Sequence, residues 1–135
     1  MDDYEKYLFR GKEKDSGKWI YGDLRHISDG HGGYILCIVD NTNGKNNDVT
    51  GVEVIPETVG MFIMLTDKNR TKIFEGDIVT GYFNHEKIVG YIFYGGNAQF
   101  FIQRDGIYGI GLDNSDCWLD VIGNIHDNPE LLKKE

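Results

Sequence analysis

Residues 71–80 read TKIFEGDIVT, and residues 17–26 read GKWIYGDLRH. Each stretch carries a lysine, two large apolar residues, one variable residue, and then Gly-Asp followed by an aliphatic residue. Gly-Asp suits the entrance of a strand, because glycine tolerates a positive φ or a bulge and aspartate accepts backbone N–H bonds across a turn. The two copies predict a structural motif at two strand entrances, formed by Gly22, Asp23, Gly76 and Asp77.

The chain after the second copy alternates short apolar runs with tight turns. The runs are KIF, DIVTGYF, KIVGYIFY, AQFFIQR, IYGIGL and CWLDVIG. Short gaps between short strands are typical of a meander, and small SH3-like barrels place glycine at their corners. The final NPELLKKE has a proline suited to the first turn of a helix. We therefore expect residues 66–135 to form a small SH3-like barrel with a short C-terminal helix.

The first 65 residues are also predicted to be β-rich. Residues 34–40, YILCIVD, form a continuous apolar run of strand length, and the Ile and Val content favours a buried strand over a helix. The fold class is therefore mainly β, and the expected organisation is two parts. Residues 1–65 form an N-terminal segment packed on the barrel, and residues 66–135 form the barrel itself.

Bulk properties exclude several classes of protein. The formal net charge of -8 counts against non-specific binding to phosphate backbones, so direct nucleic-acid binding is not expected. No apolar run is long enough to span a membrane, and the acidic opening Met1-Asp2-Asp3 does not resemble a signal peptide. Cys37 and Cys117 form no CxxC pair. These features predict a cytoplasmic protein whose two thiols pack as small hydrophobic groups.

No catalytic, cofactor-binding or metal-binding residue is predicted. The four histidines do not pair at metal-ligand spacing with one another or with the cysteines; they are His26, His31, His85 and His126. Asp23 and Asp77 could act as an acid–base pair if the two strand entrances met in a pocket. Capping of turns is the favoured interpretation, because Gly-Asp already has that local use.

Aromatic residues are abundant, with 2 Trp, 8 Tyr and 7 Phe. On small barrels, aromatic clusters serve as platforms for peptides or for single-stranded bases. The candidates for such a binding surface are Tyr82, Tyr91, Tyr94, Phe100 and Tyr108. The alternative, which we favour for most aromatic residues, is burial in the core or in a subunit interface, because aromatic side chains dominate burial energetics.

Several blocks in a fixed order resemble the YopX-like proteins of bacteriophages and prophages. They are FRGK (9–12), GKWIYGDL (17–24), PETVG (56–60), TDKN with KIFEGDIV (66–79) and VIGNIHDNPELL (121–132). The resemblance implies a β-rich phage protein of the bacterial cytoplasm, an SH3-like barrel in the C-terminal half and assembly into oligomers; it supplies no catalytic residues. The family tends to have glycine where this chain has Arg70. Asn69 is expected to take the left-handed conformation in its place.

The leading functional hypothesis is an accessory phage protein that is not an enzyme and acts by protein binding or self-assembly. Its partners would be further copies of itself or a host or phage protein, with no cofactor. The first alternative is an acidic decoy that inhibits a host nucleic-acid-handling protein through carboxylates that mimic phosphates. The second alternative is a small enzyme, which would need a pocket with convergent polar groups.

Overall fold

The computed structural model describes residues 7–40, 51–96, 98–104, 107–112 and 118–133. The chain divides into two compact units, Met1–Phe62 and Ile63–Glu135. The boundary expected from the sequence, after residue 65, falls just beyond this division. Cys117 lies outside the described residues, whereas Cys37 is buried.

The protein is mainly β, as the sequence predicts. The elements up to the boundary are β1 (Phe9–Lys12), β2 (Trp19–Ser28), β3 (Tyr34–Val39), β4 (Val52–Glu53), the 3-10 helix η2 (Pro56–Thr58) and β5 (Gly60–Thr66). The later elements are β6 (Lys72–Phe74), β7 (Asp77–Phe83), β8 (Glu86–Tyr94), β9 (Phe100–Arg104), β10 (Ile107–Gly111), β11 (Asp120–Asn124) and the 3-10 helix η4 (Pro129–Leu132). β5 begins in the first unit beside β1 and ends in the second unit beside β6.

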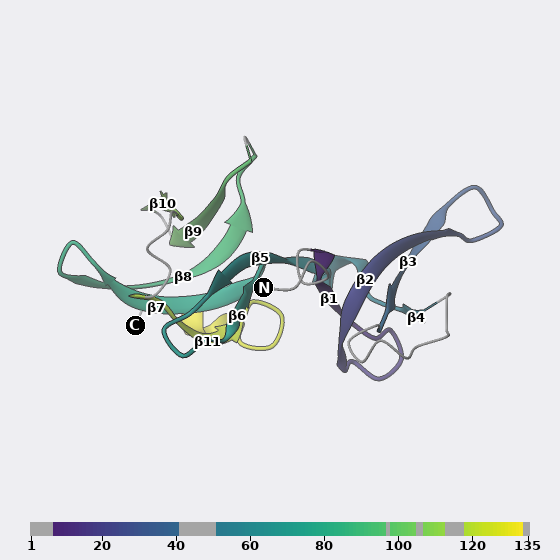
Figure 1. Ribbon diagram of the computed structural model, residues 1–135, viewed down its shortest axis with the longest axis horizontal. Helices are drawn as coiled ribbons and strands as arrows, with labels where there is room; N and C mark the ends of the chain where they lie inside the picture. The colour runs from purple at the N-terminus through teal and green to yellow at the C-terminus, as the bar shows by residue number, and fades with distance from the viewer. Residues whose placement is uncertain (1–6, 41–50, 97, 105–106, 113–117, 134–135) are drawn as a thin grey trace. The chain divides into compact units, whose positions relative to one another are not determined.

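The first unit is an antiparallel sheet in the order β4-β3-β2-β1-β5 (Figure 1). The apolar run around Ile38 forms β3, which confirms the predicted strand, and the Ile38 side chain is fully buried. Gly11 in β1 allows close packing on this face, because a Cβ there would lie 3.1 Å from the Cβ of Val54. Thr58 in η2 accepts the Lys12 N–H at 2.9 Å, and this bond holds η2 against the end of β1.

The second unit is an antiparallel sheet in the order β10-β9-β8-β7-β11. In Figure 1 the long β7–β8 hairpin carries β9 and β10 along one side. Alternation along the strands sends every second side chain inward. The buried core consists of Ile63, Ile73, Val79, Ile88, Ile92, Ile102 and Leu119.

Two details of the second unit differ from the expectation. The described strands do not close into a barrel, because β10 and β11 stand at opposite ends of the strand order. The C-terminal helix is one 3-10 turn, Pro129–Leu132, and the side chain of Asn128 does not cap it. The Asn128 Oδ1 instead accepts the N–H of Asn124 at 3.2 Å, so this side chain supports the preceding turn.

The turn before β6 corrects a third expectation. Arg70, and not Asn69, has a positive φ, at 65°. Asn69 is occupied elsewhere, since its N–H donates to the Asp67 Oδ1 at 2.8 Å and its side chain donates to Asp120. The chain therefore places an arginine in a conformation that favours glycine.

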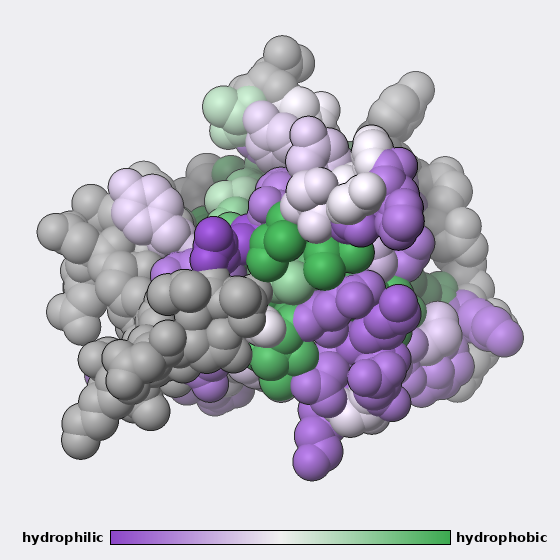
Figure 2. Space-filling model, turned by 90° about the vertical axis from the view of Figure 1, so that its right-hand side faces the viewer, coloured by the Kyte–Doolittle hydropathy of each residue, from purple (hydrophilic) through white to green (hydrophobic). Residues whose placement is uncertain are grey.

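Figure 2 views the side on which β2–β4 lie in Figure 1. Much of this face is hydrophilic, and most of the strongly hydrophobic atoms visible on it lie near its centre. Within the described residues, no helix is long and apolar enough to cross a membrane.

Candidate functional site

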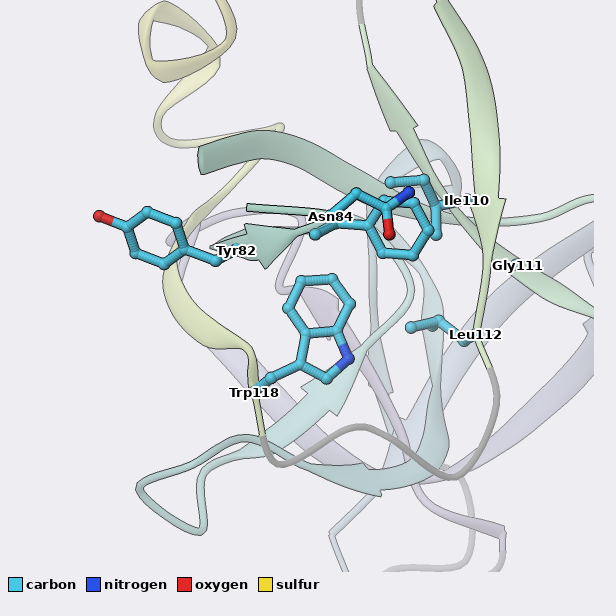
Figure 3. Close-up of a pocket in the computed structure, with 7 residues that line it drawn as sticks. Tyr82, Asn84, Ile110, Gly111, Leu112 and Trp118 are labelled. Carbon is cyan, nitrogen blue, oxygen red and sulfur yellow. The ribbon is translucent and has the colours of Figure 1, made fainter. Parts of the chain in front are cut away.

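The second unit contains a pocket of about 190 Å³ beside the tip of the β7–β8 hairpin. Its lining residues come from three separate parts of the chain: Tyr82, Phe83, Asn84, Ile110, Gly111, Leu112 and Trp118. In Figure 3 the indole of Trp118 and the side chains of Ile110 and Leu112 stand around the cavity, whereas the Tyr82 ring points away from it. The pocket is therefore walled by apolar groups and carries the Asn84 amide at its rim.

The glycine at position 81 makes room for one wall of this pocket. A Cβ on Gly81 would lie 2.6 Å from the Cε3 atom of Trp118, so the indole rests directly on the backbone of β7. The ring of Phe83 lies 6.2 Å from the Trp118 ring, centroid to centroid, at an interplanar angle of 33°. The two rings together form an aromatic wall.

The hairpin tip that forms the rim is a tight turn. Asn84 and His85 both have positive φ, at 51° and 68°, and lie between the paired residues Phe83 and Glu86. Two consecutive positive φ values define the turn type whose twist matches that of antiparallel strands. This turn fixes the position of the Asn84 amide relative to β7.

The five aromatic residues predicted as a binding surface occupy different parts of the second unit. Tyr82 is 69% exposed near the pocket rim. Tyr91 is half-buried in β8. Tyr94 and Phe100 pair across β8 and β9 with ring centroids 5.2 Å apart, and Phe100 packs against the core. The backbone of Tyr108 belongs to β10, and its side chain lies outside the described part. The structure thus brings together Tyr94 and Phe100.

A second aromatic row was not predicted. Phe93 and Phe101 pair across β8 and β9, and their rings stack with centroids 5.5 Å apart. Tyr91 extends this row, with its ring 6.1 Å from that of Phe93. Alternation could have indicated that Tyr91 and Phe93 share a face, but the partner Phe101 depends on strand register.

The two Gly-Asp segments have different surroundings. Gly76 has a φ of 92° and precedes β7, and the Asp77 Oδ2 accepts the Phe74 N–H at 2.7 Å. The second copy is therefore a strand entrance, as expected. Gly22 and Asp23 lie inside β2, so the prediction of an entrance is wrong there. Each pair belongs to its own unit, and each has a local structural role.

Asp67 is a carboxylate that accepts three backbone N–H groups, and sequence reasoning missed it. Its oxygens accept the N–H groups of Asn69, Thr71 and Val121 at 2.8, 2.9 and 3.0 Å. Burial opposes ionisation, but these three bonds and the nearby Lys68 charge outweigh it, so the pKa of Asp67 lies below its ordinary value. An ionised carboxylate saturated by backbone donors holds a turn in place and is poorly suited to proton transfer.

Groups of three or more His, Cys, Asp or Glu that could hold a metal ion do not occur in the described ranges. His26 lies near Tyr34 on β2 and β3, with their rings 6.4 Å apart, while His85 belongs to the turn at the pocket rim. The pocket beside the β7–β8 hairpin is therefore the candidate site that the described residues offer.

Comparison with known proteins assigns the fold to a family. The YopX protein family matches residues 8–133, which is nearly the whole chain. The chain belongs to the YopX protein family. No curated protein matches it. Among solved structures, one neighbour is the crystal structure of protein EF1440 from Enterococcus faecalis, with a TM-score of 0.52 and 22% sequence identity over 93% of this chain and 96% of that chain. At that identity the similarity concerns the fold alone.

Several hydrogen bonds within the two units join residues of the sequence blocks that resemble YopX proteins. Lys12 and Thr58, from the first and third blocks, are hydrogen-bonded to each other. Asp67 and Val121 join the TDKN block to the last block. Ile125 donates its N–H to the Gly76 carbonyl at 2.9 Å, which joins the last block to the Gly-Asp block.

The pocket lies outside all of these blocks, because its residues fall at 82–84, 110–112 and 118. Hydrogen bonds between these blocks thus hold strands and turns of this YopX protein together, and the pocket lies apart from them. A sequence signal for the pocket was available only in part. Gly81 next to two aromatic residues indicated a close approach, but nothing indicated that Trp118 makes it.

Proposed function

We propose that this YopX protein is an accessory protein of phage or prophage origin that is not an enzyme and binds another protein in the bacterial cytoplasm. The observation that supports the proposal is the pocket walled by Phe83, Ile110, Leu112 and Trp118. Typical small-molecule sites measure roughly 300–1,000 Å³. A cavity of about 190 Å³ is smaller, and it suits one apolar side chain of a partner protein.

The arrangement of the strands supports the same role. We infer that the second sheet is an SH3-like barrel that is left open, with β10 and β11 at opposite ends of the strand order. Barrel-like domains of this kind place ligands against exposed aromatic side chains and strand edges. Tyr82, with 69% of its surface exposed, offers such a contact at the pocket rim.

The carboxylates favour this proposal over the acidic decoy. A decoy needs carboxylates that face solvent in a spacing like that of phosphates. Asp67 and Asp77 are buried and accept backbone N–H bonds. Asp29 accepts the N–H groups of His31 and Gly33 within its own turn. These three carboxylates serve local structure.

A site-specific photo-crosslinker tests the proposal. The crosslinking amino acid p-benzoylphenylalanine is placed at Tyr82, at the pocket rim, and at Tyr34 as the matched control; the two tyrosines are 69% and 74% exposed. In bacterial cells we expect a crosslinked protein from position 82 that position 34 does not give. We expect it to be lost when Leu112→Phe fills the pocket or Phe83→Ala removes part of its wall. The same product from both positions, or a product insensitive to both pocket variants, would overturn the proposal.

Light scattering on the purified protein separates self-assembly from binding of a different protein. A crosslinked product whose second component is the same chain, together with a defined oligomer in solution, would assign the pocket to self-assembly.

A further inference from the structure

The pocket touches three consecutive residues of one strand end: Ile110, Gly111 and Leu112. In a strand, neighbouring side chains point to opposite faces, so a pocket on one face meets every second side chain. Ile110 and Leu112 both pack against the core and share that face. Gly111 can reach the pocket only through its backbone. The pocket therefore opens onto the main chain of β10.

The hydrogen-bond pattern shows which backbone groups are available there. The Leu112 N–H donates to the Phe100 carbonyl at 3.0 Å, and Gly111 lies opposite Phe101. Hydrogen-bonded and non-hydrogen-bonded pairs alternate in an antiparallel ladder. Gly111 and Phe101 are thus a non-hydrogen-bonded pair, and the N–H and C=O of Gly111 point away from β9.

No strand covers that edge in the part of the chain that the structure describes. β10 stands at the end of the strand order β10-β9-β8-β7-β11, and Gly111 is exposed. Such an edge presents a free donor and a free acceptor to another chain. Here they lie at the mouth of an apolar cavity.

We infer that the pocket and the β10 edge together bind an extended segment of a partner protein, which adds as a strand at Gly111 and inserts one large apolar side chain between Trp118 and Leu112. This inference rests on the proposed function and names its ligand. Addition of a strand at a sheet edge takes affinity from main-chain bonds and specificity from pockets that hold alternate side chains. Both components are present at this site.

The size of the cavity indicates which side chain it takes. An apolar cavity of roughly 150 Å³ accommodates a benzene molecule. The present cavity of about 190 Å³ therefore has room for the ring of phenylalanine or for a branched aliphatic side chain. Its walls, Phe83, Ile110, Leu112 and Trp118, suit either.

The charge of the chain indicates what surrounds the anchor. At a formal net charge of -8, long-range electrostatic attraction favours a basic partner segment over an acidic one. We therefore expect lysine or arginine beside the apolar anchor in the partner segment. A partner that is itself strongly acidic would not fit.

The probe for the first experiment is a random linear-peptide library displayed on phage and selected on the full-length protein. The expected peptides carry one Phe, Leu, Ile or Trp within a β-prone segment and an excess of Lys and Arg. Peptides selected through a PxxP pattern, or through apolar residues at helical spacing, would overturn the inference because neither adds a strand.

N-methylation of the selected peptide tests the backbone pairing directly. Only amides that face β10 should matter, so methylation at every second position should weaken binding roughly tenfold or more, and methylation in between should not. Equal sensitivity at all positions, or at none, would contradict strand addition. Fluorescence anisotropy of the labelled peptide measures these affinities.

Two variants of the same residue give a matched comparison in the protein. Gly111→Pro removes the outward N–H, a change that edge strands tolerate, whereas Gly111→Ala keeps it and directs its methyl group toward the flexible Gln99 side chain. We expect the proline variant to bind the peptide roughly tenfold more weakly than the alanine variant. Unfolding curves of both variants confirm that they are folded.

A pocket variant separates the two proposals. Loss of peptide binding in Leu112→Phe, with equal binding by Gly111→Pro and Gly111→Ala, would retain an apolar protein-binding pocket and overturn strand addition. Peptide binding that no pocket or edge variant changes would overturn both.

Discussion

Gly22-Asp23 and Gly76-Asp77 have the same sequence, yet glycine has a different role in each. Gly22 lies inside β2, where a Cβ would overlap the carbonyl oxygen of Val39 on the neighbouring strand. Gly76 precedes β7 with a φ of 92°. The first glycine allows two backbones to approach, and the second allows the chain to turn. The same Gly-Asp sequence therefore indicates that a side chain is disfavoured at the glycine, but it does not show whether crowding or backbone conformation is the reason.

The aspartates differ in the same way. Asp77 is 2% exposed and closes the turn before β7 by accepting the Phe74 N–H. Asp23 is half-buried and lies opposite Val39 in the middle of a ladder. A short repeat of this kind gives no reason to infer two equivalent sites.

The two units can be followed separately, because each contains one tryptophan, Trp19 in the first and Trp118 in the second. Trp118→Phe leaves a fluorescence signal from the first unit, and Trp19→Phe leaves one from the second. Urea unfolding of these two backgrounds then shows which unit each substitution destabilises.

The largest effect is expected from Gly22→Ala in the Trp118→Phe background. The new Cβ would overlap a backbone atom, so β2 and β3 must separate, and the free energy of unfolding should fall by about 3 kcal/mol or more. Gly17→Ala is the control for conformation alone, since Gly17 has a φ of 71° and open space around its Cβ position. A loss no greater than that of Gly17→Ala would refute the crowding explanation.

Asp67→Ala should produce the next largest loss, in the Trp19→Phe background. It leaves three N–H donors without their carboxylate and should cost about 2–3 kcal/mol at neutral pH. Because the pKa of Asp67 is lowered by folding, its contribution is complete above the ordinary carboxyl pKa and disappears as the pH falls through the lowered value. Urea unfolding from pH 7 to pH 2 should show the gap between wild type and variant closing. A constant gap would exclude the ionised carboxylate as the cause.

Gly76→Ala should cost about 1–2 kcal/mol, because alanine is strained at a positive φ. The loss should affect the Trp118 transition and leave the Trp19 transition unchanged. Wild-type stability in the Trp118 transition would mean that the turn before β7 relaxes without cost, and the comparison with Gly22 would need another explanation.

The smallest effect has the opposite sign. Arg70→Gly should stabilise the second unit by about 0.5–1 kcal/mol, since it relieves an arginine at a φ of 65°. Asn69→Gly is the contrasting change: it removes the side-chain bond to Asp120 and should destabilise. Stabilisation by Asn69→Gly and not by Arg70→Gly would support the conformation expected from the sequence.

Local patterns in the chain were sufficient to predict several elements. The Ile and Val run around Ile38 predicted β3, and the Gly-Asp of residues 76–77 predicted the start of β7. Each of these depends on residues that are close in sequence. The left-handed residue at the turn before β6 was misplaced by one position, because the Asn69 side chain donates a hydrogen bond to Asp120, far along the chain.

The candidate site could not be predicted in the same way. The abundance of aromatic residues in the sequence pointed to Tyr82, which the structure places at the rim, but the walls come from Phe83, Leu112 and Trp118. The approach of Trp118 to Gly81 depends on how β7 and the chain before β11 are paired. No periodicity in the sequence encodes that approach.

By itself the sequence determined the mainly β class, the positions of most strands and the YopX family. It does so because alternation, turn residues and family blocks are properties of neighbouring residues. Only the tertiary structure decided that Gly22 and Gly76 have different roles and that a pocket opens beside the edge of β10. It also decided that the Asp67 carboxylate holds its turn by accepting three backbone N–H groups. These features depend on strand register and on contacts between distant residues, which the hydrophobic pattern constrains but does not specify.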